Sequence, residues 1–102
     1  MAEHGMKIRI IKQVSEGTKD IICSRCRTGK LTREMMESKA LGLVHGDVCD
    51  IIYASDLAQK EADTMVFEIG GSCPQHLTCL GVLGDLSAVE EAVRTIQREM
   101  LY

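Results

Sequence analysis

The five cysteines are the side chains of this sequence that could bind a metal or take part in redox chemistry. The 102-residue chain carries them as Cys23, Cys26, Cys49, Cys73 and Cys79. Thiols stay reduced in the cytosol, and an odd number at irregular spacings fits a disulfide framework poorly. Metal binding, redox chemistry and burial in a core are therefore the readings that remain open.

Cys73 stands in a segment that interrupts the regular pattern of the chain. The segment reads Gly70-Gly71-Ser72-Cys73-Pro74-Gln75-His76 and contains the only proline. Paired glycines let a backbone approach a ligand or a symmetry axis, and proline stiffens a turn. A cysteine beside a proline in a turn is also often structural, so the segment alone leaves both readings open.

Cys23 and Cys26 form a C-x-x-C motif that competes with Cys73. On a helix this spacing puts both sulfurs on one face, and Arg25 and Arg27 favour thiolates. However, no second pair is present to complete a zinc site, and the motif does not follow a strand directly, as a thioredoxin-like motif does. We expect Cys49 and Cys79, which have apolar neighbours, to be small core residues.

The sequence offers no constellation for catalysis. His45 and Asp47 lie near each other at a strand–helix junction, but Asp47 is better explained as an acid at a helix N-terminus. No activated nucleophile, phosphate-binding loop or pair of carboxylates assembles elsewhere. We therefore predict that the protein is not an enzyme.

Composition excludes several function classes. The net charge is −3 and aromatic residues make up 3% of the chain, which argues against binding to nucleic acid or to an anionic membrane. No apolar run approaches the roughly 20 residues needed to span a bilayer, and residues 1–6 lack the pattern of a secretory signal. We expect a globular protein of the cytosol.

Hydrophobic periodicity predicts four strands and three helices. The strands are expected at 6–13, 40–44, 65–69 and 77–83, and a connection with a helical turn at 28–39. The helices are expected at 19–27, capped by Thr18; at 47–62; and after a capping box formed by Ser87 and Glu90. The order predicts one α/β domain, an α+β sandwich with helices packed on a mostly antiparallel four-stranded sheet.

Two helical stripes support that assignment. We expect the second helix to bury one stripe and the third helix another, with a Glu90–Arg94 ion pair on the wet face of the third. The members of the two stripes are Val48, Ile51, Ile52, Ala58 and Ala62, and then Val89, Ala92, Val93, Ile96 and Met100.

Three short motifs resemble the bacterial microcompartment (BMC) domain. They are Ala40-Leu41-Gly42, the D-x-x-x-K motif from Asp56 to Lys60, and Gly84-Asp85-Leu86-Ser87-Ala88-Val89, in the order of that family. The resemblance implies a ferredoxin-like fold. A strand–helix unit and connection at 6–38 precede the core at 39–102, as in circularly permuted members, and loop 70–76 corresponds to the pore loop.

The resemblance also implies a function. BMC domains form homohexameric tiles that pack edge to edge with other shell proteins around enzymes in the cytoplasm, and Lys60 would lie at that edge. Loop 70–76 resembles that of permuted members from glycyl-radical propanediol microcompartments, which bind an iron–sulfur cluster. The implied ligand is Cys73, with a 4Fe-4S cluster and electron transfer across the shell. A plain metabolite pore, or a small monomeric metal or redox protein using Cys23 and Cys26, remains open.

One cysteine cannot hold such a cluster within one chain, because iron–sulfur clusters need about three or four thiolates. A cyclic oligomer brings a residue near the axis next to its own copies. In a hexamer, three alternate subunits could supply three Cys73 thiolates to a cubane, with His76 as a fallback ligand. We expect Cys23 and Cys26 to lie away from this axis.

Overall fold

The computed structural model describes residues 6–71 and 77–100. The elements are β1 (Lys7–Ile11), α1 (Glu16–Arg25), a 3-10 helix η1 (Glu34–Met36), β2 (Ala40–Asp47), α2 (Val48–Glu61), β3 (Met65–Ile69), β4 (Leu77–Gly84) and α3 (Leu86–Met100). The four strands form one antiparallel sheet in the order β1-β2-β4-β3. This confirms the predicted sandwich.

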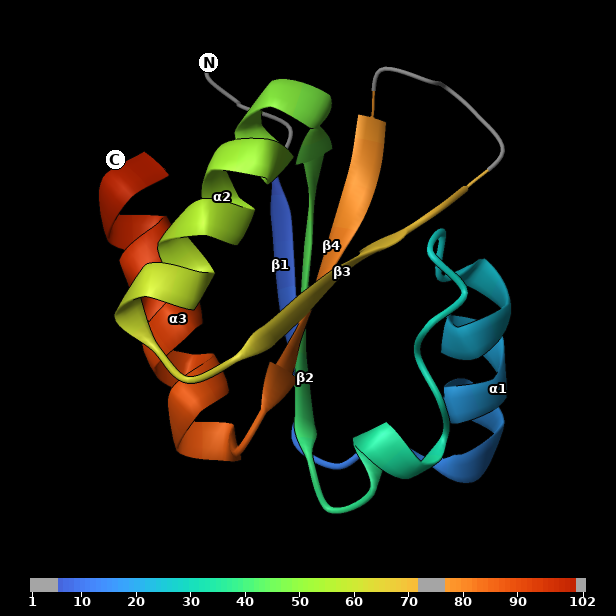
Figure 1. Ribbon diagram of the computed structural model, residues 1–102. Coiled ribbons are helices and arrows are strands. Elements are labelled where there is room, and N and C mark those ends of the chain that lie inside the picture. The colour runs from blue at the N-terminus through green and yellow to red at the C-terminus, as the bar shows by residue number, and fades with distance from the viewer. Residues whose placement is uncertain (1–5, 72–76, 101–102) are drawn as a thin grey trace.

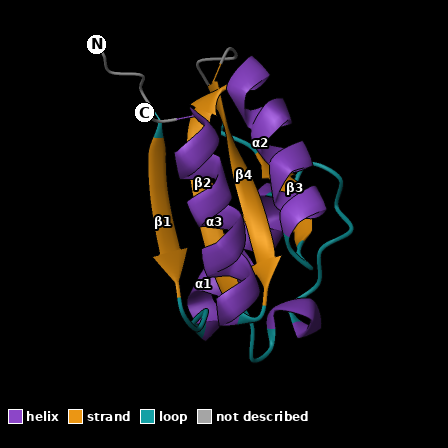
Figure 2. Cartoon of the chain, turned by 90° about the vertical axis from the view of Figure 1, so that its left-hand side faces the viewer, coloured by secondary structure: helices purple, strands orange, loops and turns teal. Residues whose placement is uncertain are grey.

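The helices cover the two faces of the sheet unequally. Helices α2 and α3 lie side by side on one face, and α1 lies on the other (Figure 1). Turned by 90°, the same molecule shows α2 and α3 in front of the strands (Figure 2). Strands β1 and β3 are the two edges of the sheet.

Helix α3 packs through the stripe that its periodicity predicts. Val89, Ala92, Val93 and Ile96 are buried, and Met100 packs against the same core. Burying a Val or Ile side chain completely contributes about 1.5–3 kcal/mol, so this face anchors the helix.

Helix α2 buries part of the expected stripe, because Ile51 and Ala58 are buried and Ala62 packs against the core. Ile51, Ala54 and Ala58 face the sheet, whereas Val48 is 37% exposed and Ile52 is 65% exposed. Both side chains line a groove beside β3 instead of entering the core. The prediction was wrong for these two residues because two neighbouring stripes of this helix are apolar, and periodicity does not say which one is covered.

The opposite face of the sheet has a core of its own. Val14, Ile22, Cys26, Leu31, Met36, Leu41, Phe67 and Leu83 form one buried cluster between the sheet and the α1 layer. The Lys19 ammonium is buried at the margin of this layer and lies 2.9 Å from Glu16 and 3.0 Å from Glu37. The hydrogen bond from Lys19 lowers the pKa of Glu16. These contacts fasten α1 to the connection that leads into β2.

The starts of two helices differ from the prediction. The N-cap of α1 is Ser15, and Thr18 lies within the helix with its hydroxyl 3.1 Å from that of Ser15. Helix α3 already begins at Leu86, so Ser87 is inside its first turn and is not the N-cap. In both cases a residue that could cap lies within a turn of the true start.

Two polar expectations on α2 and α3 have different outcomes. Asp47 caps α2 as expected, because its carboxylate accepts a hydrogen bond of 2.9 Å from the N–H of Asp50. Arg94 lies 3.7 Å from Glu91 in place of the expected pair with Glu90. Both glutamates lie one helical turn from Arg94, so periodicity does not distinguish them.

Candidate functional site

The two ends of loop 70–76 emerge at the same end of the sheet. Strand β3 ends at Ile69 and β4 begins at Leu77, and Ile69 is paired with Cys79 across the two strands. Gly70 and Gly71 are described. Ser72, Cys73, Pro74, Gln75 and His76 lie outside the described residues, so the role expected for Cys73 stays a prediction.

The C-terminal end of α1 is attached to the start of this loop. Cys26 and Ile69 form an isolated antiparallel bridge. Backbone hydrogen bonds flank it, from the N–H of Arg27 to the Glu68 carbonyl at 3.1 Å and from the N–H of Gly70 to the Arg25 carbonyl at 2.8 Å. Residues 25–27 therefore extend the sheet at the loop end of β3. The C-x-x-C motif therefore ends at the base of the loop, and its expected position away from the axis of an assembly stays a prediction.

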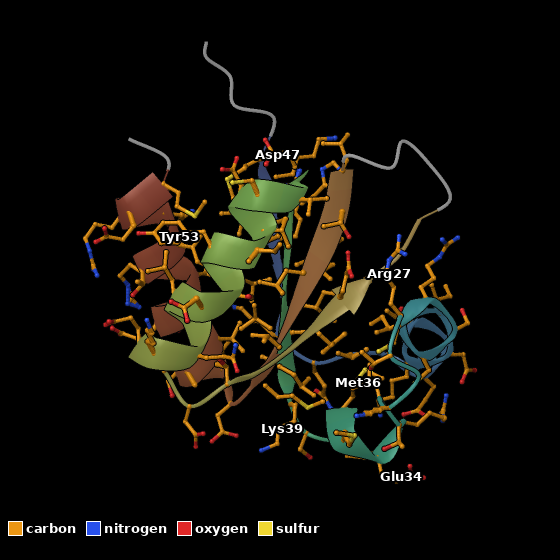
Figure 3. The ribbon with its side chains drawn as sticks, turned by 45° about the horizontal axis from the view of Figure 1, so that its top comes forward. Arg27, Glu34, Met36, Lys39, Asp47 and Tyr53 are labelled. Carbon is orange, nitrogen blue, oxygen red and sulfur yellow. The ribbon has the colours of Figure 1, made fainter. Side chains whose placement is uncertain are left out.

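A side-chain network joins the strands on either side of the loop. The Thr78 hydroxyl donates a hydrogen bond of 2.6 Å to the Glu68 carboxylate, and the Nε of Arg27 lies 3.6 Å from the same carboxylate. Figure 3 shows Arg27 beside the end of β3. Thr78 is buried, so its hydroxyl is satisfied within the protein. The network fixes β3 before the loop to β4 after it.

Gly70 is packed tightly by an arginine, whereas Gly71 is open. A Cβ atom at Gly70 would lie 2.8 Å from the Nε of Arg27, and a Cβ atom at Gly71 would meet nothing within 4 Å. The guanidinium of Arg25 also reaches the Gly70 carbonyl, at 3.4 Å. Two positive side chains therefore lie at the base of the loop.

A cavity of about 190 Å³ lies on the α1 side of the sheet at the same end. Its lining includes His45, Cys79, Leu77 and the residues from Ile69 to Gly71. His45 and Cys79 are direct partners across β2 and β4. Within the described residues, the buried Nδ1 of His45 has no hydrogen-bond partner. Partial burial raises the pKa of the Cys79 thiol. Cys79 is half-buried, so it is not the fully buried core residue that was expected.

The other predicted positions have mixed outcomes. Cys49 is exposed on α2, so its assignment to the core was wrong. Lys60 is exposed and pairs with Asp56 at 2.8 Å. In the described part of the chain, no three His, Cys, Asp or Glu side chains gather as metal ligands. The contacts of Arg25 and Arg27 with the loop were missed because local sequence patterns carry no signal for a contact so distant in sequence.

Comparison with solved structures supplies the family. The GrpU microcompartment shell protein from Pectobacterium wasabiae, in a ligand-free structure, is 33% identical. The match covers 89% of this chain and 99% of that chain, with a TM-score of 0.67. This chain belongs to the microcompartment shell proteins. The predicted membership is thereby confirmed, although no protein-family model and no curated protein matches the sequence.

Two further structures agree with this membership. The ligand-free GrpU shell protein from Clostridiales bacterium 1_7_47FAA is 27% identical, with a TM-score of 0.68 over 94% of this chain and 96% of that chain. A fused permuted hexameric shell protein from the RMM microcompartment is 16% identical, with a TM-score of 0.71 over 91% of this chain and 44% of that chain. This last likeness concerns the fold alone and fits the predicted permutation.

Family membership decides between several of the sequence-based readings. Microcompartment shell proteins are structural proteins and not enzymes, and they form the wall of the compartment. The interpretation of the chain as a small monomeric metal or redox protein therefore gives way to that of a shell protein. None of the helices described is long and apolar enough to cross a membrane.

Proposed function

We propose that the chain forms a cyclic homohexameric shell tile in which loop 70–76 surrounds a central pore and Cys73 binds an iron–sulfur cluster. The observation that carries this proposal is the fixed base of the loop. Backbone bonds from residues 25–27 and the Arg27–Glu68–Thr78 network hold both strands where the loop begins and ends. Such a base would present the same residues to the axis in every subunit.

Exposed apolar surface at the sheet edges supports the cyclic assembly. At the β3 edge, Val48, Ile52 and Val66 line a groove of about 250 Å³. At the β1 edge, a hollow of about 570 Å³ contains Ile8, the exposed Ile10 and part of α3. A ring with one subunit type needs two different surfaces that meet head to tail, and these edges offer them. Exposed apolar patches commonly mark such interfaces.

The residues at the loop base fit an iron–sulfur cluster. A cluster with thiolate ligands carries net negative charge, and Arg25 supplies positive charge at the Gly70 carbonyl, whereas the charge of Arg27 is balanced by Glu68. Neither Gly70 nor Gly71 adds a side chain that would compete for the axis. Loop 70–76 contains one cysteine, which is too few for a cluster, so copies of Cys73 from several subunits would share it.

The cluster, of the cubane 4Fe-4S type, would supply one-electron transfer through the shell. Ser72 and backbone N–H groups of the loop would donate hydrogen bonds to its sulfurs, and such bonds tune reduction potential. Because loop 70–76 resembles that of shell proteins from glycyl-radical propanediol microcompartments, the proposed compartment would enclose this metabolism. Other shell proteins would adjoin the tile along the edge that carries Lys60.

Anaerobic purification tests this proposal. Native mass spectrometry should give six chains per particle, and chemical analysis should give about four iron and four sulfide per hexamer, as one cubane requires. A hexamer that takes up no iron after anaerobic reconstitution would instead be a tile with a plain metabolite pore. A monomer would contradict the tile itself.

A further inference from the structure

We propose that Cys23 and Cys26 form a thiol–disulfide couple that exchanges with low-molecular-weight disulfides such as glutathione disulfide. This activity lies beyond the proposed cluster and does not depend on it. Both cysteines belong to the described part of the chain, and no third side chain joins them there as a metal ligand.

The local backbone suits disulfide closure. Cys23 lies in the last turn of α1, and Cys26 caps the helix with extended backbone. The N–H of Cys26 donates to the Cys23 carbonyl at 3.4 Å, which closes a turn between them. A turn with this bond brings the two Cα atoms within about 7 Å, and disulfides form at about 4.4–6.8 Å.

The surroundings of the Cys26 sulfur favour a thiolate. Burial raises the pKa of the Cys26 thiol, but hydrogen bonds from the Thr28 hydroxyl and from backbone N–H groups of Thr28, Leu31 and Gly29 outweigh it, so the pKa is lowered. The Thr28 hydroxyl lies 3.5 Å from the sulfur. Gly29 has a φ of 70°, a conformation that glycine adopts without strain and that lets the turn wrap around the sulfur.

The two sulfurs differ in access, which assigns their roles. Cys26 is 8% exposed, whereas Cys23 is half-buried on the helix surface. Cys23 is therefore the sulfur that meets a small disulfide, and Cys26 is the sulfur that completes the exchange.

The reaction is balanced in two steps. The Cys23 thiol loses its proton to water, and its thiolate attacks one sulfur of glutathione disulfide. A mixed disulfide forms and one glutathione thiolate leaves. The Cys26 thiol also loses its proton to water, and its thiolate attacks the Cys23 sulfur and expels the second glutathione thiolate. The two glutathione thiolates take up two protons from water. Two protein thiols are oxidised to one disulfide, and one glutathione disulfide is reduced to two thiols.

The couple is positioned to affect the loop. Arg25 and Arg27 flank Cys26, and their backbones hold Gly70 and Glu68. A Cys23–Cys26 disulfide would constrain the turn that contains Arg25. The redox state of the pair would thereby be transmitted to the base of loop 70–76.

Mass spectrometry of the full chain tests the couple directly. A Cys49→Ser/Cys73→Ser background removes the exposed thiol and the proposed cluster ligand, so failure of the cluster proposal does not affect the result. The protein is incubated with excess glutathione disulfide, alkylated and digested. Trypsin cleaves after Arg25, so a Cys23–Cys26 disulfide should keep fragments 20–25 and 26–27 joined until dithiothreitol is added. Two alkylated thiols at these positions, or a bond from Cys26 to Cys79, would overturn the proposal.

Two variants test the separate roles of the sulfurs. Cys26→Ser should trap glutathione on Cys23, and Cys23→Ser should carry little glutathione at Cys26 because the Cys26 sulfur is buried. Thr28→Val should raise the pKa of the Cys26 thiol and slow the second step several-fold at neutral pH, with a smaller effect at high pH. If Thr28 has only a structural role, the pH profile of the second step will be the same in Thr28→Val as in the wild type. Such a result would overturn the role assigned to Cys26.

Discussion

Cys26 and Ile69 are bridge partners, so the end of α1 is built into the edge of the sheet where β3 gives way to loop 70–76. The strand–helix unit that precedes the core is thus in contact with the segment proposed to line the pore. Backbone bonds on both sides of the bridge make this contact a continuation of the sheet. The position of the loop base therefore depends on residues far from it in sequence.

Gly70→Ala should destabilise the protein by about 1 kcal/mol because the new Cβ atom meets the Nε of Arg27 at 2.8 Å. The side chain of Arg27 is flexible and half-exposed, which keeps the cost low. Urea unfolding gives the change. Gly71→Ala is the matched control, and its free energy of unfolding should stay close to that of the wild type because its Cβ atom meets nothing.

A double-mutant cycle identifies the cause of that loss. In Arg27→Ala, the obstacle to a side chain at position 70 is removed, so adding Gly70→Ala should cost less than it does in the wild type. Directly contacting residues show such coupling. Strict additivity of the two changes would mean that the guanidinium does not pack on Gly70.

Gly81→Ala should cost about 1–3 kcal/mol, because a Cβ atom on β4 would lie 2.5 Å from ring atoms of the buried Phe67. Gly17→Ala in α1 meets nothing within 4 Å and replaces glycine in a helix, so it should be neutral or stabilising by up to about 1 kcal/mol. Thermal unfolding of the two variants is the comparison. Equal midpoints would argue against the close packing of Phe67 on Gly81.

Most helices and strands could be predicted from the sequence because each has a clear local pattern of apolar residues. Alternation predicts β3 with its observed bounds at Met65 and Ile69, and helical spacing predicts the buried face of α3. The N-cap Ser15 of α1 and the start of α3 at Leu86 were missed because another polar residue that could cap follows each within one turn. Local patterns limit the precision of such boundaries.

Sequence patterns could predict the position of the candidate loop but not the contacts that hold its base. The unusual composition of loop 70–76 marks it in the sequence. Its anchoring does not, because the bond between Gly70 and Arg25 joins distant segments and Thr78 has no local reason to meet Glu68. Likewise, nothing in the helical pattern says that Ile52 faces solvent in the single chain.

Lys60→Ala should leave hexamers intact and impair their assembly into two-dimensional sheets, if Lys60 lies at the proposed tile edge. The local ion pair with Asp56 is exposed and contributes little by itself. Asp56→Ala breaks the same pair and keeps the lysine, so it should still form sheets. Electron microscopy distinguishes the two variants, and equal sheet formation by both would contradict an edge role for Lys60.

Cys23→Ser combined with Cys26→Ser should leave the bound iron nearly unchanged, even though the pair lies beside the loop. The proposed ligands are the Cys73 thiolates, and the buried Cys26 sulfur is already engaged by Thr28. Iron and sulfide per hexamer are the quantities to measure. Loss of most of the iron from an intact hexamer would transfer the site to this pair.

Iron and sulfide content of Cys73→Ser after anaerobic reconstitution tests the central claim most directly. Serine is a much poorer ligand for iron in these clusters, and the loss is repeated in every contributing subunit. The matched control is Cys49→Ser, which removes an exposed thiol from α2 and should keep the wild-type iron content. We predict that Cys73→Ser elutes as the hexamer and lacks both the brown colour and the broad visible absorbance. Iron and sulfide per hexamer equal to those of the wild type would contradict the account.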